Sequence, residues 1–204
     1  MSNFAVILCG GKSKRFDHQN KALIKYKNIS FIKRIAKNLE NLPIENIIIS
    51  TKENLKNELF EESKDFGNKI KFVIDIVDFD GPLAGIISVL QYFKDGNFLF
   101  TTVDRIFIDY EDLLKFFDFS GVLAVFSKVE NNLLPLPVLY NAKIIYLWEI
   151  FKKNKPSSFS IKSWNEFILN FLEKDLIAFV NFKERSKTLI DINNWQEYYE
   201  WCRE

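Results

Sequence analysis

Short apolar runs alternate along the chain with segments of helical periodicity, and this alternation restricts the fold more than any other feature of the sequence. The pattern is typical of βα units, in which each helix packs back onto a mainly parallel sheet. We expect strands at Phe4–Cys9, Asn46–Thr51, Ile70–Ile76, Asn97–Val103, Val122–Lys128, Pro135–Tyr140, Leu176–Val180 and Thr188–Ile192.

The segments between these runs predict amphipathic helices. Ser30 is placed to cap the first helix, in which Phe31 and Ile35 share one face while Lys33 takes the other. The last helix is expected to begin near Asn194, because Asn194 and Glu197 have capping-box spacing. Other helices are expected over Glu53–Lys64, Ala84–Lys94, Tyr110–Phe117, Ala142–Lys153 and Ser163–Glu173.

Composition excludes several classes of protein. The formal net charge of +1 leaves no surplus for reading a nucleic-acid backbone, so we expect no nucleic-acid partner. With two cysteines and the single histidine His18, the chain lacks the ligands of a zinc or histidine-rich metal site. No apolar stretch is long enough to cross a membrane, and the amino terminus has no basic region of a secretory signal. We therefore expect a cytoplasmic protein without a membrane partner.

A glycine pair follows the first predicted strand and leads into a basic segment. Gly10 and Gly11 let the main chain approach an anion closely, and the lysines and arginine of the next residues can neutralise it. The spacing does not fit a P-loop, because Val6 stands where its first glycine is needed, and it contains no G-x-G-x-x-G fingerprint. A phosphate-binding loop and a solvated basic turn remain as alternatives.

Asp104 directly follows the predicted strand Asn97–Val103. In an open α/β sheet, ligands bind at the carboxyl ends of the strands. A carboxylate there suits Mg²⁺, which takes oxygen ligands and keeps substrate phosphates in its coordination shell. A turn or helix-capping aspartate is the alternative interpretation.

Five segments, in this order and spacing, resemble nucleotidyltransferases of the molybdenum cofactor guanylyltransferase type. They are Leu8–Phe16 with the following Lys21–Ile24, Gly81–Ile86 (G-P-L-A-G-I), Phe98–Asp104, Pro135–Tyr140 (P-L-P-V-L-Y) and Asp191–Asn194. The first segment is shared with many sugar and cofactor nucleotidyltransferases. Its combination with the G-P-L-A-G-I and P-L-P-x-L-Y segments favours the molybdenum cofactor branch.

The resemblance implies an α/β fold, in which residues 1–204 form a single three-layer Rossmann-like nucleotidyltransferase domain with a mainly parallel central sheet. It implies a Mg²⁺-dependent transfer of GMP from GTP to the terminal phosphate of molybdopterin cofactor, giving molybdopterin guanine dinucleotide and pyrophosphate. Molybdoenzymes or other cofactor-biosynthesis proteins are implied as further partners. Alternatives are transfer of CMP to the cofactor, nucleotide transfer to a sugar or cobinamide phosphate, and a nucleotide-binding regulator without catalysis.

The resemblance also assigns site residues. Lys21 and Arg15 would grip the phosphates, with Arg15 on the departing pyrophosphate, and Asp104 would hold Mg²⁺. Gly81 and Pro82 would make the turn that starts a helix pointing its positive end at the cleft. Nucleotide contacts fall on Leu8, Cys9, Gly10, Gly11, Lys21, Asp75 and Asp104, with Asp78 and Asp80 as rivals for the position of Asp75.

The chain departs from the family pattern near these residues. Phe16-Asp17 replaces Met-Gly, Asn20 replaces an acidic residue, and Ser50 stands where Asn is usual. Arg105, next to the metal aspartate, would weaken Mg²⁺ binding or touch phosphate itself.

The carboxy-terminal motif leaves two interpretations open. Asp191 and Asn193 would supply a second oxygen near the metal, or they would cap the last helix.

Overall fold

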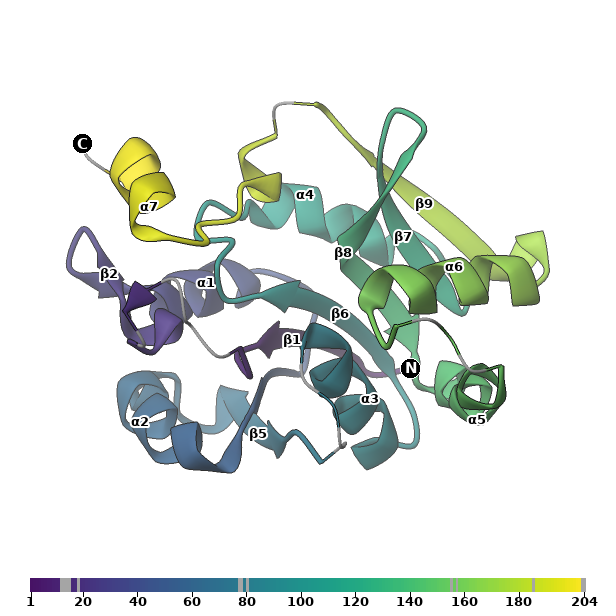
Figure 1. Cartoon of the computed structure of the whole chain (residues 1–204), viewed down its shortest axis with the longest axis horizontal. Coiled ribbons are helices and arrows are strands. Elements are labelled where there is room, and N and C mark those ends of the chain that lie inside the picture. Colours follow the sequence, from purple (N-terminus) through teal and green to yellow (C-terminus); the bar gives the residue numbers. More distant parts are fainter. Residues whose placement is uncertain are drawn as a thin grey trace.

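The computed structural model is built around a seven-stranded sheet of order β5-β4-β1-β6-β8-β7-β9 (Figure 1). It describes residues 1–11, 16–17, 19–76, 79, 81–154, 156, 158–184 and 186–202. The strands are β1 Asn3–Leu8, β4 Asn46–Thr51, β5 Ile70–Ile74, β6 Asn97–Thr102, β7 Ala124–Val129, β8 Asn132–Asn141 and β9 Ile177–Phe182. Only β8 runs antiparallel to its neighbours in this sheet, so the predicted mainly parallel sheet is confirmed.

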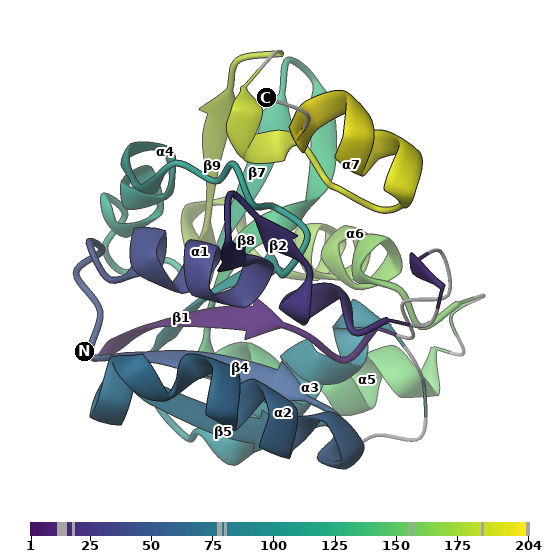
Figure 2. The same cartoon turned by 90° about the vertical axis from the view of Figure 1, so that its left-hand side faces the viewer.

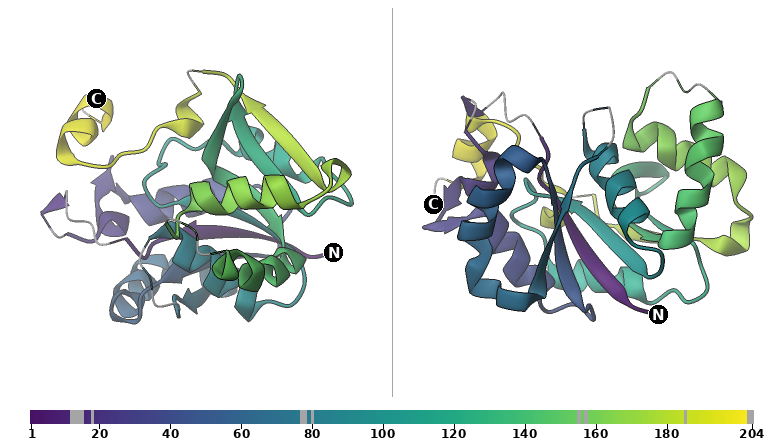
Figure 3. Two further views of the ribbon diagram at one scale, coloured as in Figure 1. Left: turned by 45° about the vertical axis from the view of Figure 1, so that its right-hand side comes forward. Right: turned by 90° about the horizontal axis from the view of Figure 1, so that it is seen from below.

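Helices cover both faces of this sheet, which gives the predicted three layers (Figure 3). The helices are α1 Phe31–Leu39, α2 Glu53–Ser63, α3 Pro82–Tyr92, α4 Tyr110–Leu114, α5 Leu147–Lys153, α6 Ile161–Phe171 and α7 Trp195–Cys202. Residues of α1, α2, α4 and α7 contribute to the buried cluster on one face, and residues of α3, α5 and α6 to the cluster on the other.

Alternation within the central strand explains the two cores. In β1, Ala5 and Ile7 face the cluster with α1, whereas Phe4, Val6 and Leu8 face the cluster with α3. A strand buried on both faces reads as a continuous apolar run, which is why the sequence signal at β1 is strong.

The predicted helix caps are confirmed. The Ser30 hydroxyl accepts a hydrogen bond from the Lys33 amide at the start of α1. At α7 the Asn194 side chain accepts from the Glu197 amide at 2.9 Å. Gly81 precedes α3 with a φ of 107°, a left-handed conformation that favours glycine, and Pro82 occupies the first helical position.

The eighth predicted strand, Thr188–Ile192, is wrong. A 3₁₀ turn occupies Lys187–Leu189, and the segment that follows is extended but joins no sheet. Thr188 instead uses its hydroxyl, which accepts from the Asp109 amide and donates to Asp112. Polar side-chain bonds of this kind compete with a strand ladder, and an apolar pattern does not reveal them.

Strand β8 begins earlier than predicted and contains both prolines of the P-L-P-V-L-Y segment. Pairing with β6 covers residues 138–141 only, and the register with β7 shifts between Phe126 and Lys128. Pro135 and Pro137 therefore lie where a missing amide donor interrupts no regular ladder.

A two-stranded hairpin, β2 Lys25–Tyr26 with β3 Ile29–Ser30, was not predicted. It faces the viewer in Figure 2 together with α7, and the Tyr198 hydroxyl donates to the Lys25 carbonyl at 2.7 Å. Among the described helices, none is long and apolar enough to span a bilayer.

Candidate nucleotide-binding site

A cavity of about 310 Å³ lies at the carboxyl edge of the sheet, where β1 is flanked by β4 on one side and β6 on the other. The chain runs outward from β1 to β4 and β5 and then returns to β6, so this edge is a topological switch point, where open α/β sheets bind ligands. Its lining residues are Leu8, Cys9, Gly10, Gly11, Phe16, Asn20, Lys21, Ala22, Ser50, Asp75, Gly81, Pro82, Gly85, Thr102, Val103, Asp104 and Asn193.

Two glycines let the floor of the cavity close tightly. A Cβ on Gly10 would stand 2.3 Å from Oδ2 of Asp75, and a Cβ on Gly85 would stand 2.4 Å from Oγ of Ser50. Gly11, by contrast, has no atom of the described residues within 4 Å of the place where a Cβ would stand. The glycine loop therefore needs Gly10 for close approach to Asp75, whereas Gly11 faces the open part of the cavity.

Ser50 and Asp75 form one polar pair of the site. The Ser50 hydroxyl donates to Oδ1 of Asp75 at 2.6 Å, and the Asp75 amide donates to the Thr51 carbonyl at 2.9 Å. Burial raises the pKa of Asp75, while the Ser50 hydrogen bond and nearby Lys52 oppose that rise. Ser50 is fully buried, so its contact with Asp75 makes it a residue that positions the carboxylate.

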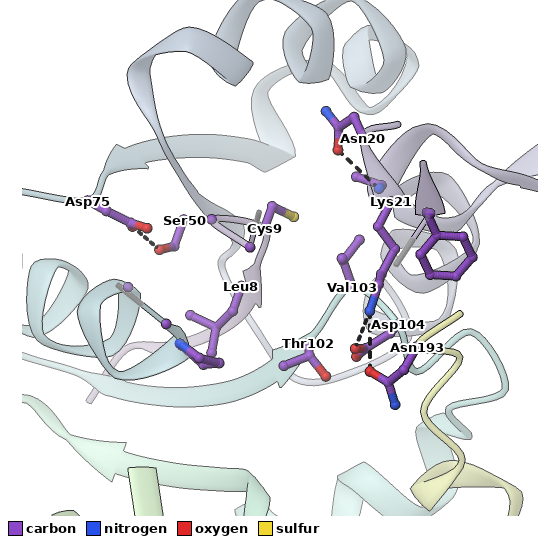
Figure 4. Close-up of a pocket in the computed structure, with 17 residues that line it drawn as sticks. Leu8, Cys9, Asn20, Lys21, Ser50, Asp75, Thr102, Val103, Asp104 and Asn193 are labelled. Carbon is purple, nitrogen blue, oxygen red and sulfur yellow. Dashed lines mark hydrogen bonds and ion pairs between the residues drawn. The ribbon is translucent and has the colours of Figure 1, made fainter. Parts of the chain in front are cut away.

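Lys21 and Asp104 form a second polar pair across the cavity (Figure 4). The Lys21 ammonium donates to Oδ2 of Asp104 at 2.8 Å and to Oδ1 of Asn193 at 3.4 Å. Asn20 caps the 3₁₀ turn at Lys21–Leu23 by accepting from the Ala22 amide at 3.2 Å. This turn aims Lys21 at the strand end that carries Asp104.

The free oxygen of Asp104 fits a cation. Its Oδ1 is buried and has no hydrogen-bond partner among the described residues, although a buried carboxylate oxygen normally has one. The described residues hold no cluster of three or more His, Cys, Asp or Glu side chains that could bind a metal by themselves. A single carboxylate that leaves room for substrate phosphates and waters matches the usual coordination of Mg²⁺.

Cys9 is a buried packing residue at the base of the cavity. Burial raises the pKa of its thiol, and the Asp75 and Asp104 carboxylates raise it further. The protonated thiol is a poor nucleophile. Cys9 therefore contributes its backbone: its amide donates to the Ser50 carbonyl at 2.7 Å, which ties the glycine loop to β4.

Arg105, the cation next to Asp104 in the sequence, has protein partners in the structure and also lines the second cavity described below. It is buried and donates to Oδ1 of Asp191 and to the Leu136 carbonyl, both at 2.7 Å. Burial raises the pKa of Asp191, and the Arg105 guanidinium opposes that rise. Because Asp191 neutralises Arg105, this cation is a structural partner of the carboxy-terminal segment.

The two carboxy-terminal residues have separate roles in the structure. Asp191 pairs with Arg105, and Asn193 contacts Lys21, so neither caps α7. The Ile192 amide donates to the Asp104 carbonyl at 3.0 Å and fixes this segment beside β6.

A second cavity, of about 440 Å³, adjoins the first and shares Gly81, Pro82, Thr102 and Asp104 with it. Its other lining residues are Leu83, Arg105, Pro135, Leu136, Phe159, Ser160, Ile161, Lys162 and Asp191. Gly81 and Pro82 line both cavities, so the helix start that the motif predicted lies at the cleft.

The structure brings most of the predicted nucleotide-binding residues into the first cavity. Leu8, Cys9, Gly10, Gly11, Lys21, Asp75 and Asp104 all line it. Arg15, Asp78 and Asp80, and the basic residues Lys12 and Lys14, lie outside the described residues. Sequence reasoning missed the pairing of Arg105 with Asp191, because 86 positions separate them and no local pattern connects them.

Comparison with known proteins agrees with this geometry. The family described as "MobA-like NTP transferase domain" matches residues 5–161. A "probable molybdenum cofactor guanylyltransferase" of Clostridium perfringens strain 13 is 32% identical over 199 residues, covering 95% of this chain and 93% of that protein. A protein of the same description from Methanosarcina mazei is 29% identical over 159 residues, covering 75% and 70%.

A solved structure has the same fold. Molybdopterin-guanine dinucleotide biosynthesis protein A from Archaeoglobus fulgidus superposes with a TM-score of 0.71 at 15% identity, covering 98% of this chain and 97% of that one. The family match spans more than half of the chain, and the C. perfringens relative exceeds 30% identity over nearly its whole length. The chain therefore belongs to the MobA-like NTP transferase family.

Proposed function

We propose that this protein transfers the guanylyl group of GTP to the terminal phosphate of molybdopterin cofactor. An oxygen of that phosphate attacks the α-phosphorus of GTP, the bond from the α-phosphorus to its bridging oxygen breaks, and pyrophosphate leaves with the electron pair. Positioning and charge neutralisation accomplish most of such a transfer, so no nucleophilic side chain is required. The names of the curated relatives support guanylyl transfer over the other nucleotidyl transfers.

The observation that carries the proposal is the pairing of Lys21 with Asp104, which lies just beyond the carboxyl end of β6. Both side chains are largely buried, with 16% and 14% of their surface exposed. A triphosphate entering here would meet a cation beside a carboxylate whose second oxygen has no partner within the described part of the chain. That combination serves a metal-bound polyphosphate, because the lysine neutralises phosphate while the carboxylate holds the metal.

The remaining nucleotide contacts are assigned by position in the cavity. The backbone of Gly10 and Gly11 and the carbonyl of Cys9 are assigned to the sugar and phosphates, and Asp75 lies at the opposite side of the cavity from Lys21 (Figure 4). We assign Asp75 to the nucleoside, because a carboxylate there can accept hydrogen bonds from ring nitrogens of a base. Arg15, from the basic segment after the glycine pair, is assigned to the departing pyrophosphate.

Mg²⁺ is the metal we propose for Asp104. When bound, it would neutralise charge on the triphosphate and so help pyrophosphate to leave. Asp104 supplies the protein ligand, and Lys21 remains within reach of the phosphates from the 3₁₀ turn at Lys21–Leu23.

The second cavity is the proposed place for the acceptor. It joins the nucleotide cavity at Asp104, and its wall combines the apolar side chains of Leu136, Phe159 and Ile161 with the cation of Lys162. A ring-bearing molecule with a terminal phosphate fits such a lining. We further propose that residues 1–204 act as one nucleotidyltransferase domain, and that the product passes to molybdoenzymes or other cofactor-biosynthesis proteins.

The test is pyrophosphate release from GTP, with CTP and ATP in parallel, in the presence of Mg²⁺ and molybdopterin cofactor. We expect release with GTP, and Asp104→Asn should reduce it by about 100-fold or more because the metal ligand becomes neutral. Asp118→Asn, at an exposed position, is the matched control and should leave the rate unchanged.

Other outcomes point to the alternative functions. Release with CTP, or with another acceptor, would replace the guanylyl assignment by a sister nucleotidyl transfer. Triphosphate binding without any release would identify a nucleotide-binding regulator. An unchanged rate in Asp104→Asn would contradict the metal assignment.

A further inference from the structure

The carboxy-terminal helix contacts the segment that follows the glycine loop through one tryptophan. The indole of Trp195 donates from Nε1 to Oδ2 of Asp17 at 2.9 Å. Its ring meets that of Phe16 edge to face, with 5.2 Å between centroids and an interplanar angle of 74°. Such an arrangement of two rings is favourable beyond the area that it buries. Trp195 therefore holds two consecutive residues by two different kinds of contact.

Phe16 and Asp17 are the positions at which the chain departs from the Met-Gly of the family pattern. Asp17 has a φ of 51°, in the left-handed region that glycine adopts without cost. The aspartate keeps this backbone conformation and gains an acceptor for the Trp195 indole. Phe16 is fully buried and supplies the ring that packs against Trp195. Both departures thus contact the same tryptophan.

The same contacts continue to the lysine of the nucleotide cavity. The Lys21 ammonium lies 5.5 Å from the centroid of the Phe16 ring, a cation–π distance. Lys21 also donates to the side-chain oxygen of Asn193. The backbone amide of Asn193 in turn donates to the Glu197 carboxylate of α7 at 2.6 Å. The start of α7 therefore reaches Lys21 along two routes, one through Phe16 and one through Asn193.

We propose that Trp195 and Asp17 are positioning residues for triphosphate binding, and that Trp195, at the start of α7, clamps Phe16 and Asp17 in place. The clamp is the set Phe16, Asp17 and Trp195. It fixes the Phe16 ring beside Lys21, so that the ammonium is held over the cavity before substrate enters. This inference rests on the proposed nucleotide-binding function of the cavity.

Binding of GTP with Mg²⁺, measured by isothermal titration calorimetry, tests the clamp in Asp17→Gly, in Trp195→Phe and in the double variant. Glycine retains the backbone conformation at position 17 and removes the acceptor, and phenylalanine retains a ring at 195 and removes the donor. Each single variant should raise the Kd for GTP about fivefold, because each removes a hydrogen bond to a charged group. The double variant should have the same Kd for GTP as the single variants, because both changes break the same hydrogen bond.

Two further readouts separate positioning from a general loss of stability. In pyrophosphate release the KM for GTP should rise while kcat changes less than about twofold, since the clamp does not touch the reacting atoms. The Tm of Asp17→Gly should not fall, because glycine relieves the left-handed backbone as the hydrogen bond is lost. Trp201→Phe is the matched control on the same helix, and it should bind GTP as the unchanged protein does, because its ring contacts Phe107 and not Phe16.

The outcomes distinguish this inference from the proposed function. Tight GTP binding by the unchanged protein with the same Kd in both single variants would overturn the clamp alone. Additive weakening in the double variant would also overturn it. Absence of triphosphate binding by the unchanged protein would overturn the proposed function, and the clamp with it.

Discussion

Gly10 and Gly11 are adjacent in the sequence, yet the structure gives alanine at these two positions opposite consequences. A Cβ at Gly10 would stand 2.3 Å from Oδ2 of Asp75, whereas ordinary contact begins at 3.4 Å. The carboxylate would have to recede by about 1 Å. A displacement of that size is enough to lengthen the 2.6 Å hydrogen bond from Ser50 to Oδ1 of Asp75 beyond the usual limit of about 3.2 Å.

The expected loss follows from that bond. A hydrogen bond to a partly buried carboxylate contributes about 1–2 kcal/mol, so Gly10→Ala should lower the free energy of unfolding by that amount. For a chain of this size the Tm would fall by about 2–8 °C. Displacing Asp75 should also raise the Kd for GTP about tenfold, which corresponds to about 1.4 kcal/mol.

Calorimetric titration with GTP and thermal unfolding measure the two effects in the same samples. Gly11→Ala is the matched control for stability, because no described residue has an atom within 4 Å of its Cβ position, and it should match the unchanged protein in Tm. If Gly10→Ala bound GTP as tightly as the unchanged protein does, Asp75 would not be a nucleotide contact and its assignment to the nucleoside would be refuted.

Two further predictions concern the charged groups around the cavity. Burial raises the pKa of Asp75, so the folded chain binds this proton more tightly than the unfolded chain, and stability is lost as the pH rises through that window. Asp75→Asn should therefore raise the Tm at pH 7, and the Tm of the variant and of the unchanged protein should become equal below about pH 4. A pH series of melting curves in which the two Tm values do not become equal would contradict the raised pKa of Asp75. Arg105→Met would leave the Asp191 carboxylate without its guanidinium, and because Asp191 is 36% exposed the cost should be about 1–2 kcal/mol, seen as a Tm lower by about 2–8 °C. Removing the charge of Asp191 as well, in Arg105→Met with Asp191→Asn, should restore part of that loss; an unchanged Tm in the single variant would show that the pair is not stabilising.

The sheet was predictable because its strands are buried on both faces. β1 and β4 read as apolar runs, and the amphipathic α1 has its cap at Ser30, so each local signal agrees with the final structure. The error at Thr188–Ile192 has the opposite origin. There an apolar pattern is present, but hydroxyl bonds to Asp112 and the contact of Ile192 with the Asp104 carbonyl decide the backbone.

The candidate site was predictable where its residues belong to contiguous motifs or strand ends. Gly10, Lys21 and Asp104 were identified in this way, and all three line the cavity. Contacts between distant segments were not predictable. The bond between Trp195 and Asp17 joins residues 178 positions apart, and only the packing of α7 beside the β2 hairpin brings them together.

The carboxy-terminal segment has a consequence for the order in which the protein forms during translation. All seven strands of the large sheet are encoded between Asn3 and Phe182. The residues that contact Asp104 and Lys21 from the other side, Ile192 and Asn193, emerge from the ribosome afterwards. A nascent chain can therefore expose all seven strands before the residues that complete this wall of the nucleotide cavity have been made.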